Sequence, residues 1–190
     1  MKRSKSQIRI IGGEWRGSRL DVLDKDGLRP TPDRIRETLF NWLVRDVPGA
    51  NVLDCFAGAG GLGLEAASRE ARQVTMVDRN RSITNNLSAL CDRLGAKNTR
   101  VVQSDVLGFL QSDTACYNLV FIDPPYALTE LRSSVLDTLI ERNLLCTDAL
   151  IYLEWPIEQE MRLNHADLTW VKQKKAGRVS YAIAQWNGTR

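Results

Sequence analysis

From residue 51 to residue 154, short apolar runs alternate with longer amphipathic segments, and this rhythm restricts the fold more than any other feature. The short runs are rich in strand-forming residues, whereas the longer segments repeat apolar side chains at helical spacing. Strands separated by helices pair in parallel, and the helices cover both faces of the sheet. The sequence therefore predicts a three-layer α/β domain.

The expected elements follow one another at short intervals. Strands are predicted at residues 51–55, 73–77, 100–103, 117–122 and 149–154, and helices at 60–69, 81–94, 106–111 and 128–141. Two further strand-like runs, 168–172 and 178–186, flank a basic turn around Gly177. They predict a hairpin that finishes the sheet with an antiparallel edge.

Residues 8–22 contain two short alternating runs around Gly12-Gly13, a pattern typical of a β-hairpin. Arg9, Arg16 and Arg19 would project from it, with Trp15 among them. Basic side chains interleaved with an aromatic ring suit RNA phosphates and bases. The alternative is that Trp15 only packs the hairpin against the body.

The stretch that follows, Arg29-Pro-Thr-Pro-Asp33, predicts a loop that enters a helix. Thr31 is expected to cap this helix, with Pro32 at its first position, and the helix should end before Pro48. We therefore divide the chain into a basic N-terminal hairpin extension, residues 1–30, and a main domain, residues 31–190.

Basic residues are concentrated at the two ends of the chain. Residues 1–20 hold six Lys/Arg and one acid, and residues 170–190 hold five and no acid, although the whole chain has a formal net charge of only +3. Basic ends on an acidic body suggest a polyanion-binding surface built from both termini. A solvated tail and an exposed hairpin would have the same composition.

Cysteine and histidine usage argues against several other chemistries. The four cysteines, Cys55, Cys91, Cys116 and Cys146, form no Cys-x-x-Cys pair, so separate small thiols in a reducing compartment are expected rather than a metal site or a disulfide framework. The single histidine, His165, disfavours His-based triads and multi-histidine metal centres. No apolar run approaches the roughly 20 residues that span a bilayer. We expect a cytoplasmic protein without a metal.

The first predicted strand runs into a glycine-rich loop. Gly58, Gly60 and Gly63 satisfy the pattern G-x-G-x-x-G, and Asp78 lies 20 residues beyond Gly58. This spacing fits a dinucleotide site in which the acid binds a ribose hydroxyl. However, Asp54 precedes the glycines, where its carboxylate would repel a pyrophosphate but would accept hydrogen bonds from the ammonium group of S-adenosylmethionine.

Acidic residues follow the next predicted strands as well. Asp105 would offer an acceptor to an adenine amine, and Asp123 follows the fourth strand. Open α/β sheets bind ligands at the carboxyl ends of their strands. Each acid, Asp54 and Asp78 included, could instead cap the helix that follows it. Four acids beside a glycine loop favour a ligand site.

The apolar run Tyr117–Ile122 ends in Asp123-Pro124-Pro125-Tyr126. The prolines end ladder pairing and stiffen the loop. A nucleobase amine is a poor nucleophile because its lone pair is delocalised into the ring. The Asp123 carboxylate and the Pro124 carbonyl would accept its two N–H bonds and aim that lone pair at a methyl-sulfonium. The Tyr126 ring would stack on an extruded base.

Four blocks of the sequence resemble the RsmD family, whose members are bacterial S-adenosylmethionine-dependent methyltransferases acting on a guanine N2 amine of 16S ribosomal RNA. The blocks are residues 9–17, 28–41, 53–60 and 123–126. The first two are specific, whereas the glycine loop and Asp-Pro-Pro-Tyr occur widely among amino-methyltransferases. Asp78 stands where relatives often have Glu, and Tyr126 where they often have Phe.

The resemblance implies a Rossmann-like methyltransferase sheet, mostly parallel with an antiparallel C-terminal edge, plus a small N-terminal hairpin. It implies S-adenosylmethionine as cofactor and 16S ribosomal RNA or the small ribosomal subunit as partner, and we expect a monomer. The implied cofactor-binding residues are Asp54, Phe56, Gly58, Gly60, Asp78, Asp105 and Val106; those for the target amine are Asp123, Pro124 and Tyr126. The candidate RNA-binding residues are Arg9, Arg16, Arg19, Arg29 and Arg34.

Three other functions share part of this pattern. A DNA adenine-N6 or other amino-methyltransferase shares Asp-Pro-Pro-Tyr but usually needs a further domain to read sequence, for which the chain leaves little room. An NAD-binding oxidoreductase shares the glycine loop but has no use for Asp-Pro-Pro-Tyr. A non-catalytic RNA-binding module would use the basic ends alone, so substitution of Asp123 would leave it unaffected.

Overall fold

The computed structural model describes residues 7–21, 31–125, 128 and 130–189. Its helices are α1 (Asp33–Trp42), α2 (Gly63–Ser68), α3 (Arg81–Leu94), α4 (Val106–Ser112) and α5 (Leu131–Glu141). Its strands are β1 (Gln7–Arg9), β2 (Arg19–Asp21), β3 (Asn51–Asp54), β4 (Gln73–Asp78), β5 (Thr99–Gln103), β6 (Tyr117–Ile122), β7 (Leu145–Pro156), β8 (Leu168–Ala176) and β9 (Val179–Trp186).

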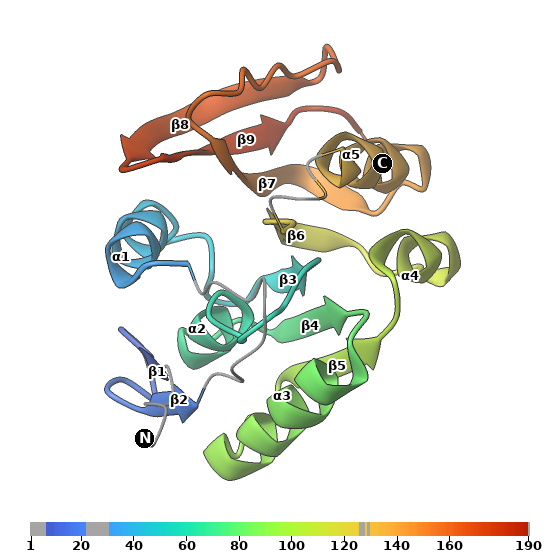
Figure 1. The fold of residues 1–190 in the computed structure, drawn as a ribbon. Helices are drawn as coiled ribbons and strands as arrows, with labels where there is room; N and C mark the ends of the chain where they lie inside the picture. The colour runs from blue at the N-terminus through green and yellow to red at the C-terminus, as the bar shows by residue number, and fades with distance from the viewer. Residues whose placement is uncertain (1–6, 22–30, 126–127, 129, 190) are drawn as a thin grey trace.

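Seven strands form one sheet in the order β5-β4-β3-β6-β7-β9-β8 (Figure 1). Strands β5, β4, β3, β6 and β7 pair in parallel, and β9 and β8 add an antiparallel edge. This arrangement confirms the predicted fold class, including the C-terminal hairpin. Strands β7 and β8 are longer than predicted, because β7 also pairs with β9 up to Pro156 and β8 pairs with β9 up to Ala176.

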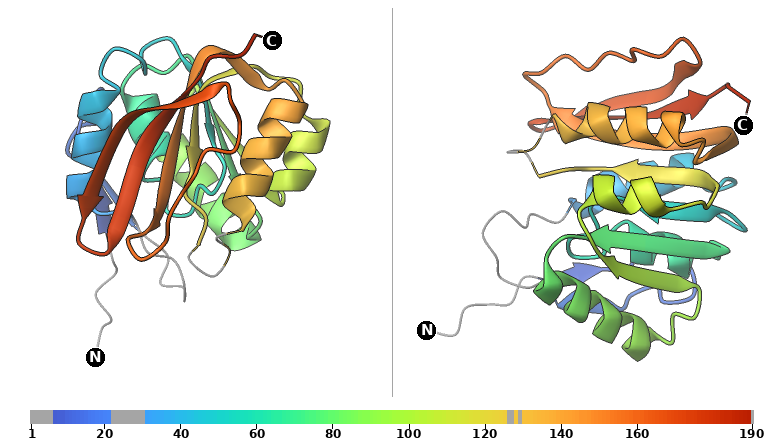
Figure 2. Two further views of the ribbon diagram at one scale, coloured as in Figure 1. Left: turned by 90° about the horizontal axis from the view of Figure 1, so that it is seen from above. Right: turned by 90° about the vertical axis from the view of Figure 1, so that its right-hand side faces the viewer.

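Helices cover both faces of the sheet, and Figure 2 shows α1 (blue) and α5 (orange) on opposite sides. One core lies between the sheet and helices α1, α2 and α3, and it includes Leu119 and Phe121 of β6. The other core lies under α4 and α5 and includes Val120 and Ile122. Because β6 is buried on both faces, its sequence is a continuous apolar run rather than an alternation.

The N-terminal hairpin packs against the first core. Strands β1 and β2 are antiparallel, and Ile8, Ile10 and Leu20 are buried in the same core as α1 and α2. The predicted hairpin is confirmed, but the prediction that it turns tightly at Gly12-Gly13 is wrong, since Arg9 pairs with Arg19. The strands are short and a longer connection joins them, because the main-chain N–H groups of Ile11 and Gly12 donate to the Glu65 carboxylate at 2.7 and 2.8 Å.

Glu65 of α2 is the centre of a buried charged cluster that fixes this connection. Its side chain is fully buried and lies 2.7 Å from Nε of Arg69 and 3.6 Å from Nη1 of Arg36. Arg36, on α1, also donates to the main-chain oxygen of Arg9 at 2.8 Å. The hairpin, α1 and α2 are therefore joined by one set of charge-assisted hydrogen bonds.

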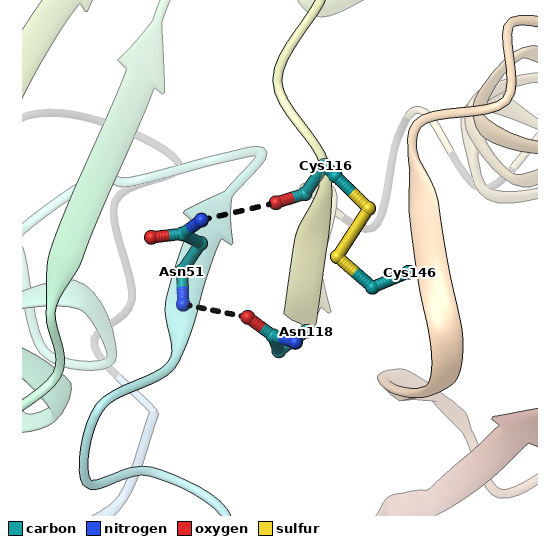
Figure 3. The surroundings of a disulfide bond; sticks show 4 residues. All are labelled: Asn51, Cys116, Asn118 and Cys146. Atoms are coloured by element: carbon teal, nitrogen blue, oxygen red, sulfur yellow. Dashed lines mark hydrogen bonds between the residues drawn. A yellow bond between two sulfur atoms is a disulfide. The ribbon is translucent and has the colours of Figure 1, made fainter.

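Cys116 and Cys146 are joined by a disulfide bond, with Cα atoms 5.3 Å apart (Figure 3). The prediction of separate thiols is wrong for this pair. Parallel pairing of β6 with β7 brings the two residues within bonding distance, although they are 30 residues apart in sequence. Asn51 of β3 donates to the Cys116 carbonyl at 3.3 Å, which places the bond at the edge where the parallel strands begin. Cys55 and Cys91 are free and buried.

In the described ranges, no helix has the length and apolar character needed to cross a membrane. Nor do the described residues contain a group of three or more His, Cys, Asp or Glu side chains that could hold a metal ion.

Candidate active site

Four acidic residues lie where β3, β4, β5 and β6 end. The structure brings three of them, Asp54, Asp78 and Asp123, close enough for the negative charges of Asp78 and Asp123 to raise the pKa of Asp54. Strands β3 and β6 are direct neighbours, with Asp54 paired to Phe121 two residues before Asp123. The site therefore combines the glycine loop after β3 with the Asp-Pro-Pro loop after β6.

Asp54 is buried, with 3% of its surface exposed. Its Oδ2 oxygen accepts a hydrogen bond from the N–H of Gly63, the first residue of α2, at 2.9 Å. Burial raises the pKa of Asp54 to about 7, although the main-chain N–H groups of Gly63 and Phe56 oppose the shift. A buried carboxyl group whose nearest charged neighbours are also acids favours a cationic ligand.

The glycine loop passes too close to its surroundings for larger residues. Gly60 has φ +80°, and a Cβ atom there would lie 2.6 Å from Cδ2 of Leu87. A Cβ atom on Gly63 would lie 2.6 Å from Cγ of Met76. Gly58 donates its N–H to Oδ2 of Asp78 at 3.1 Å, so Asp78 positions the loop as well as being a candidate ribose ligand.

The other residues predicted to bind the cofactor contribute to the fold, as a helix cap or in the core. Asp105 caps α4, because its Oδ1 oxygen accepts a hydrogen bond from the N–H of Gly108 at 2.8 Å. The helix-capping alternative is therefore correct for this acid, and its contact with adenine stays a prediction. Val106 is buried, and Phe56 is half-buried and packs against the second core.

Asp123 follows β6 directly and is half-buried, and Pro124 is buried. Burial raises the pKa of Asp123 to about 6, against a hydrogen bond from Thr31 and the positive charge of Arg132. The hydroxyl of Thr31 donates to Oδ2 of Asp123 at 3.2 Å. Tyr126 and Arg29 lie outside the described residues.

Thr31 was predicted to cap α1, and that prediction is wrong. Pro32 occupies the N-cap position and provides no side-chain cap, while Thr31 hydrogen-bonds to Asp123 instead. The segment before α1 therefore contacts the acidic residue of the Asp-Pro-Pro motif. Sequence reasoning missed this role because 92 residues separate the two side chains.

Three further residues around Asp123 were also missed. Arg132 of α5 donates to the main-chain oxygen of Glu154 at 2.7 Å, and the Tyr152 hydroxyl donates to Oε2 of Glu154 at 2.8 Å. Burial and the charge of Asp123 raise the pKa of Glu154 to about 8. Tyr152 and Glu154 could be found only from the register of β7 against β6, in which Ile122 pairs with Leu153, and Arg132 only from the packing of α5 on β7.

The candidate RNA-binding arginines that the structure describes, Arg9, Arg16, Arg19 and Arg34, are exposed. Trp15 is half-buried and packs against the first core, as the alternative interpretation expected. Sequence reasoning placed the other basic end on the C-terminal hairpin, where the lysines of β8 are exposed. Pro156, at the carboxyl end of β7, pairs with Val179 beside the hairpin turn, so this turn lies at the same edge of the sheet as Asp123.

A cavity of about 170 Å³ lies beside this turn. It is lined by Trp155, Gln173, Lys174, Lys175, Ser180 and Tyr181. The cavity offers room for about five or six water molecules, which is small for a ligand pocket.

Comparison with known proteins places this site in context. The sequence model of the family described as conserved hypothetical protein 95 matches residues 8–185. Ribosomal RNA small subunit methyltransferase D of Escherichia coli K12 is 44% identical over 179 residues, which cover 94% of this chain and 90% of that protein. The protein of the same name from Haemophilus influenzae is 38% identical over 186 residues, covering 96% and 95%.

A solved structure described as putative methyltransferase yhhF from Escherichia coli is similar over nearly its whole length. It has a TM-score of 0.90 at 41% sequence identity, and the match covers 96% of this chain and 99% of that one.

Proposed function

This chain belongs to the RsmD family, described as conserved hypothetical protein 95, and on that premise we propose that it methylates the N2 amine of a guanine in 16S ribosomal RNA, with S-adenosylmethionine as methyl donor. The resemblance in the sequence is thus confirmed at the level of the family. Two relatives named ribosomal RNA small subunit methyltransferase D, each covered over at least 90% of its length, support the substrate class.

The pairing of β3 with β6 is the observation that carries this proposal. It sets the glycine loop that begins at Asp54 beside the Asp123-Pro124 motif, with Asp54 paired to Phe121. An oxidoreductase would need the first loop only. A methyltransferase needs both, because the methyl donor and the accepting amine must meet in one place.

The described residues fit S-adenosylmethionine on electrostatic grounds. Asp54, Asp78 and Asp123 converge, and the charges of the latter two add to the effect of burial in raising the pKa of Asp54. A ligand that carries an ammonium and a sulfonium group would offset this accumulation of negative charge. We assign the ammonium to Asp54, a ribose hydroxyl to Asp78 and the adenine to the region of Asp105 and Val106. When bound, the cofactor supplies an electrophilic methyl group.

Asp123 and Pro124 bind the target amine in this proposal. The Thr31 hydroxyl engages Oδ2 of Asp123. Oδ1 and the Pro124 carbonyl then accept the two N–H bonds of the amine, which draws its lone pair out of conjugation and directs it at the methyl group. We retain stacking of the base on Tyr126 as part of the proposal.

The exposed basic side chains provide the RNA contacts. Arg9, Arg16, Arg19 and Arg34 would bind phosphates, and we add Arg29 from the sequence. Residues 1–30 then act as an RNA-binding extension of the domain formed by residues 31–190. We expect a monomer that works in the cytoplasm on 16S RNA or on the small ribosomal subunit.

Mass spectrometry of ribosomal RNA nucleosides tests the proposal directly. Cells without the protein should lack one N2-methylguanosine of 16S RNA, and the wild-type gene should restore it. The Asp123→Ala variant should not restore it, yet calorimetry should show that it still binds S-adenosylmethionine. Methylation that survives the Asp123→Ala change, or tight binding of NAD without binding of S-adenosylmethionine, would contradict the proposal.

A further inference from the structure

Glu154 lies beside Asp123 on the neighbouring strand. Strands β6 and β7 are parallel, and Ile122 pairs with Leu153, so the next residue of each strand is Asp123 and Glu154. Phe121 and Tyr152 come one position before Ile122 and Leu153, and their rings pack together with centroids 6.2 Å apart. Because side chains alternate along a strand, Asp123 and Glu154 extend from the same face as these two rings.

The positive charge near these two carboxyl groups does not balance their combined negative charge. Glu154 is 6% exposed. Among the described residues, a single guanidinium, that of Arg132, acts favourably on both charges. Arg132 directs one hydrogen bond to the main-chain oxygen of Glu154 and another to Gln159, at 2.7 and 2.8 Å, rather than to either carboxylate. A buried carboxylate of this kind needs N–H donors from another source.

The orientation of Glu154 is fixed by Tyr152. The Tyr152 hydroxyl is buried and donates to Oε2 of Glu154 at 2.8 Å. This bond leaves Oε1 to meet a substrate, in the same way that Thr31 engages only Oδ2 of Asp123. Each of these two neighbouring carboxyl groups thus has one oxygen held by a hydroxyl donor.

We propose that Glu154 is a specificity residue that accepts the N1–H of the target guanine while Asp123 accepts its N2 amine. The inference rests on the proposed function and gives it a physical reason for choosing guanine. Guanine presents its amine next to the N1–H donor, so two adjacent acceptors match this edge. Burial and the charge of Asp123 raise the pKa of Glu154 to about 8, and an N–H donor from the base favours its ionised form.

The same pair of acceptors disfavours the other bases that carry an amine. Adenine presents its amine next to the N1 lone pair, and cytosine next to the N3 lone pair. Either lone pair would face Oε1 of Glu154 and repel it. A site built to accept a particular N–H rejects an analogue that lacks it, because a buried polar group is then left without its partner.

Three substrates test this role. Once the methylated guanine has been located, RNA is prepared by ligation with guanosine, 2-aminopurine riboside or 1-methylguanosine at that position. The second keeps the amine but has a lone pair at N1, and the third keeps the amine and O6 but has no N1–H. The wild-type protein should methylate both analogues at least about tenfold more slowly than guanosine.

The Glu154→Gln variant should reverse part of this preference. With the amide oxygen facing the Tyr152 hydroxyl, the amide N–H faces the base, where it matches N1 of 2-aminopurine and clashes with N1–H of guanine. We expect the ratio of the guanosine rate to the 2-aminopurine rate to fall at least about tenfold. The matched control is Glu160→Gln, at a side chain that is 72% exposed, which should keep the wild-type ratio.

Each outcome decides between distinct conclusions. The Glu154→Gln variant could be slowed equally on guanosine and on 2-aminopurine, which leaves the ratio of the two rates unchanged. That result would mean that Glu154 only supports the fold. Wild-type methylation of 1-methylguanosine as fast as guanosine would overturn the inference without any variant. The Tyr152→Phe variant retains the Glu154 carboxylate but removes its hydroxyl donor. It should lower the ratio of the guanosine rate to the 2-aminopurine rate by a smaller factor than Glu154→Gln does. A wild-type protein inactive on guanosine would overturn the proposed function itself, and with it the role of Glu154.

Discussion

The hydrogen bond from Thr31 to Asp123 connects the two blocks of sequence that are furthest apart in the proposed site. A hydroxyl that donates to a carboxylate stabilises its ionised form, and Thr31 does lower the pKa of Asp123 relative to burial alone. Asp123 must be an acceptor in order to hold an amine. In the proposed reaction Thr31 would therefore position Asp123, whereas in the structure it does not cap α1.

We predict that the Thr31→Val variant loses methylation activity by about tenfold or more while its affinity for S-adenosylmethionine is unchanged. The pKa of Asp123, now about 6, should rise without this donor, so the acidic limb of the pH–rate profile should move to higher pH. Thr38→Val on α1, where the lost hydroxyl donates to the Arg34 carbonyl, is the control. An unshifted pH profile with reduced activity would assign Thr31 to folding alone.

Raised pKa values also predict how the stability of the protein without ligands depends on pH. The pKa of Asp54 is raised from 3.8 to about 7 and that of Glu154 from 4.5 to about 8. Between pH 4.5 and 8 the folded state keeps protons that the unfolded state has released, so the free energy of unfolding should fall as pH rises.

Urea unfolding at pH 5.5 and pH 8.5 measures this effect. The Glu154→Gln variant should show a smaller difference in midpoint between the two conditions, because one of the responsible groups is gone. The exposed control Glu160→Gln should behave as the wild type. Stability that increases from pH 5.5 to pH 8.5 would contradict the raised pKa values.

Residue chemistry was predictable from the sequence where a motif carries it locally. Asp54, the glycines and Asp123 could be placed at strand ends because each follows an apolar run directly. The roles of Thr31 and Glu154 could not be predicted, since they depend on contacts across elements and on the register of β7 with β6. For Asp105 the sequence left both a ligand role and a helix-capping role open, and the structure shows the cap.

At the scale of elements, the N-terminal hairpin depends on one buried carboxylate. Glu65 accepts hydrogen bonds from Ile11 and Gly12 and pairs with Arg69 and Arg36, and it has no exposed side-chain surface. The hairpin is therefore a packed part of the first core rather than a tail. Its sequence pattern predicted the strands but not the residue on α2 to which they are attached.

Glu65→Gln should lower the free energy of unfolding by about 1–3 kcal/mol, since Ile11, Gly12 and Arg69 lose a charged acceptor while Arg36 keeps its ion pair with Asp33 at 2.7 Å. Glu37→Gln on the exposed face of α1 is the matched control and should change stability by less than about 0.5 kcal/mol. Urea unfolding followed by circular dichroism measures both. A Glu65→Gln protein as stable as the control would show that the cluster adds nothing to docking of the hairpin.

On the scale of the whole molecule, exposed basic residues lie on the two hairpins, whereas the carboxyl ends of the parallel strands carry acids. The exposed arginines of the N-terminal hairpin and the lysines of the β8–β9 hairpin belong to opposite ends of the chain, and both hairpins join the body that carries Asp123. In the proposed complex the basic groups would attract the RNA backbone, whereas the carboxylates would repel phosphates and accept a base edge. Position and charge together favour entry of a base edge.

Replacing Arg9, Arg16 and Arg19 with Ala should weaken RNA binding and reduce the slope of log K against log salt by about 2, if each arginine contacts one phosphate. Calorimetric affinity for S-adenosylmethionine should remain unchanged. Arg142→Ala, on an exposed residue after α5, is the control. A salt slope equal to that of the wild type would remove these three arginines from the RNA interface.

The parallel pairing, the three layers and the antiparallel C-terminal edge could be predicted from the sequence, because the alternation of apolar runs and amphipathic segments allows few arrangements. What could not be predicted are contacts between distant segments: the length of β8, the position of the N-terminal turn and the bond between Cys116 and Cys146. Each depends on which segments become neighbours, and one chain carries no direct signal for that.

Strand β8 is one of the two edge strands of the seven-stranded sheet, and the lysines at positions 172, 174 and 175 are exposed along it. An unprotected edge strand invites another sheet to extend it, and lysine is among the residues that prevent such pairing, because stacking a second strand there would bury the charge. These lysines therefore favour a sheet that ends at β8 rather than one that pairs with a second copy of the chain.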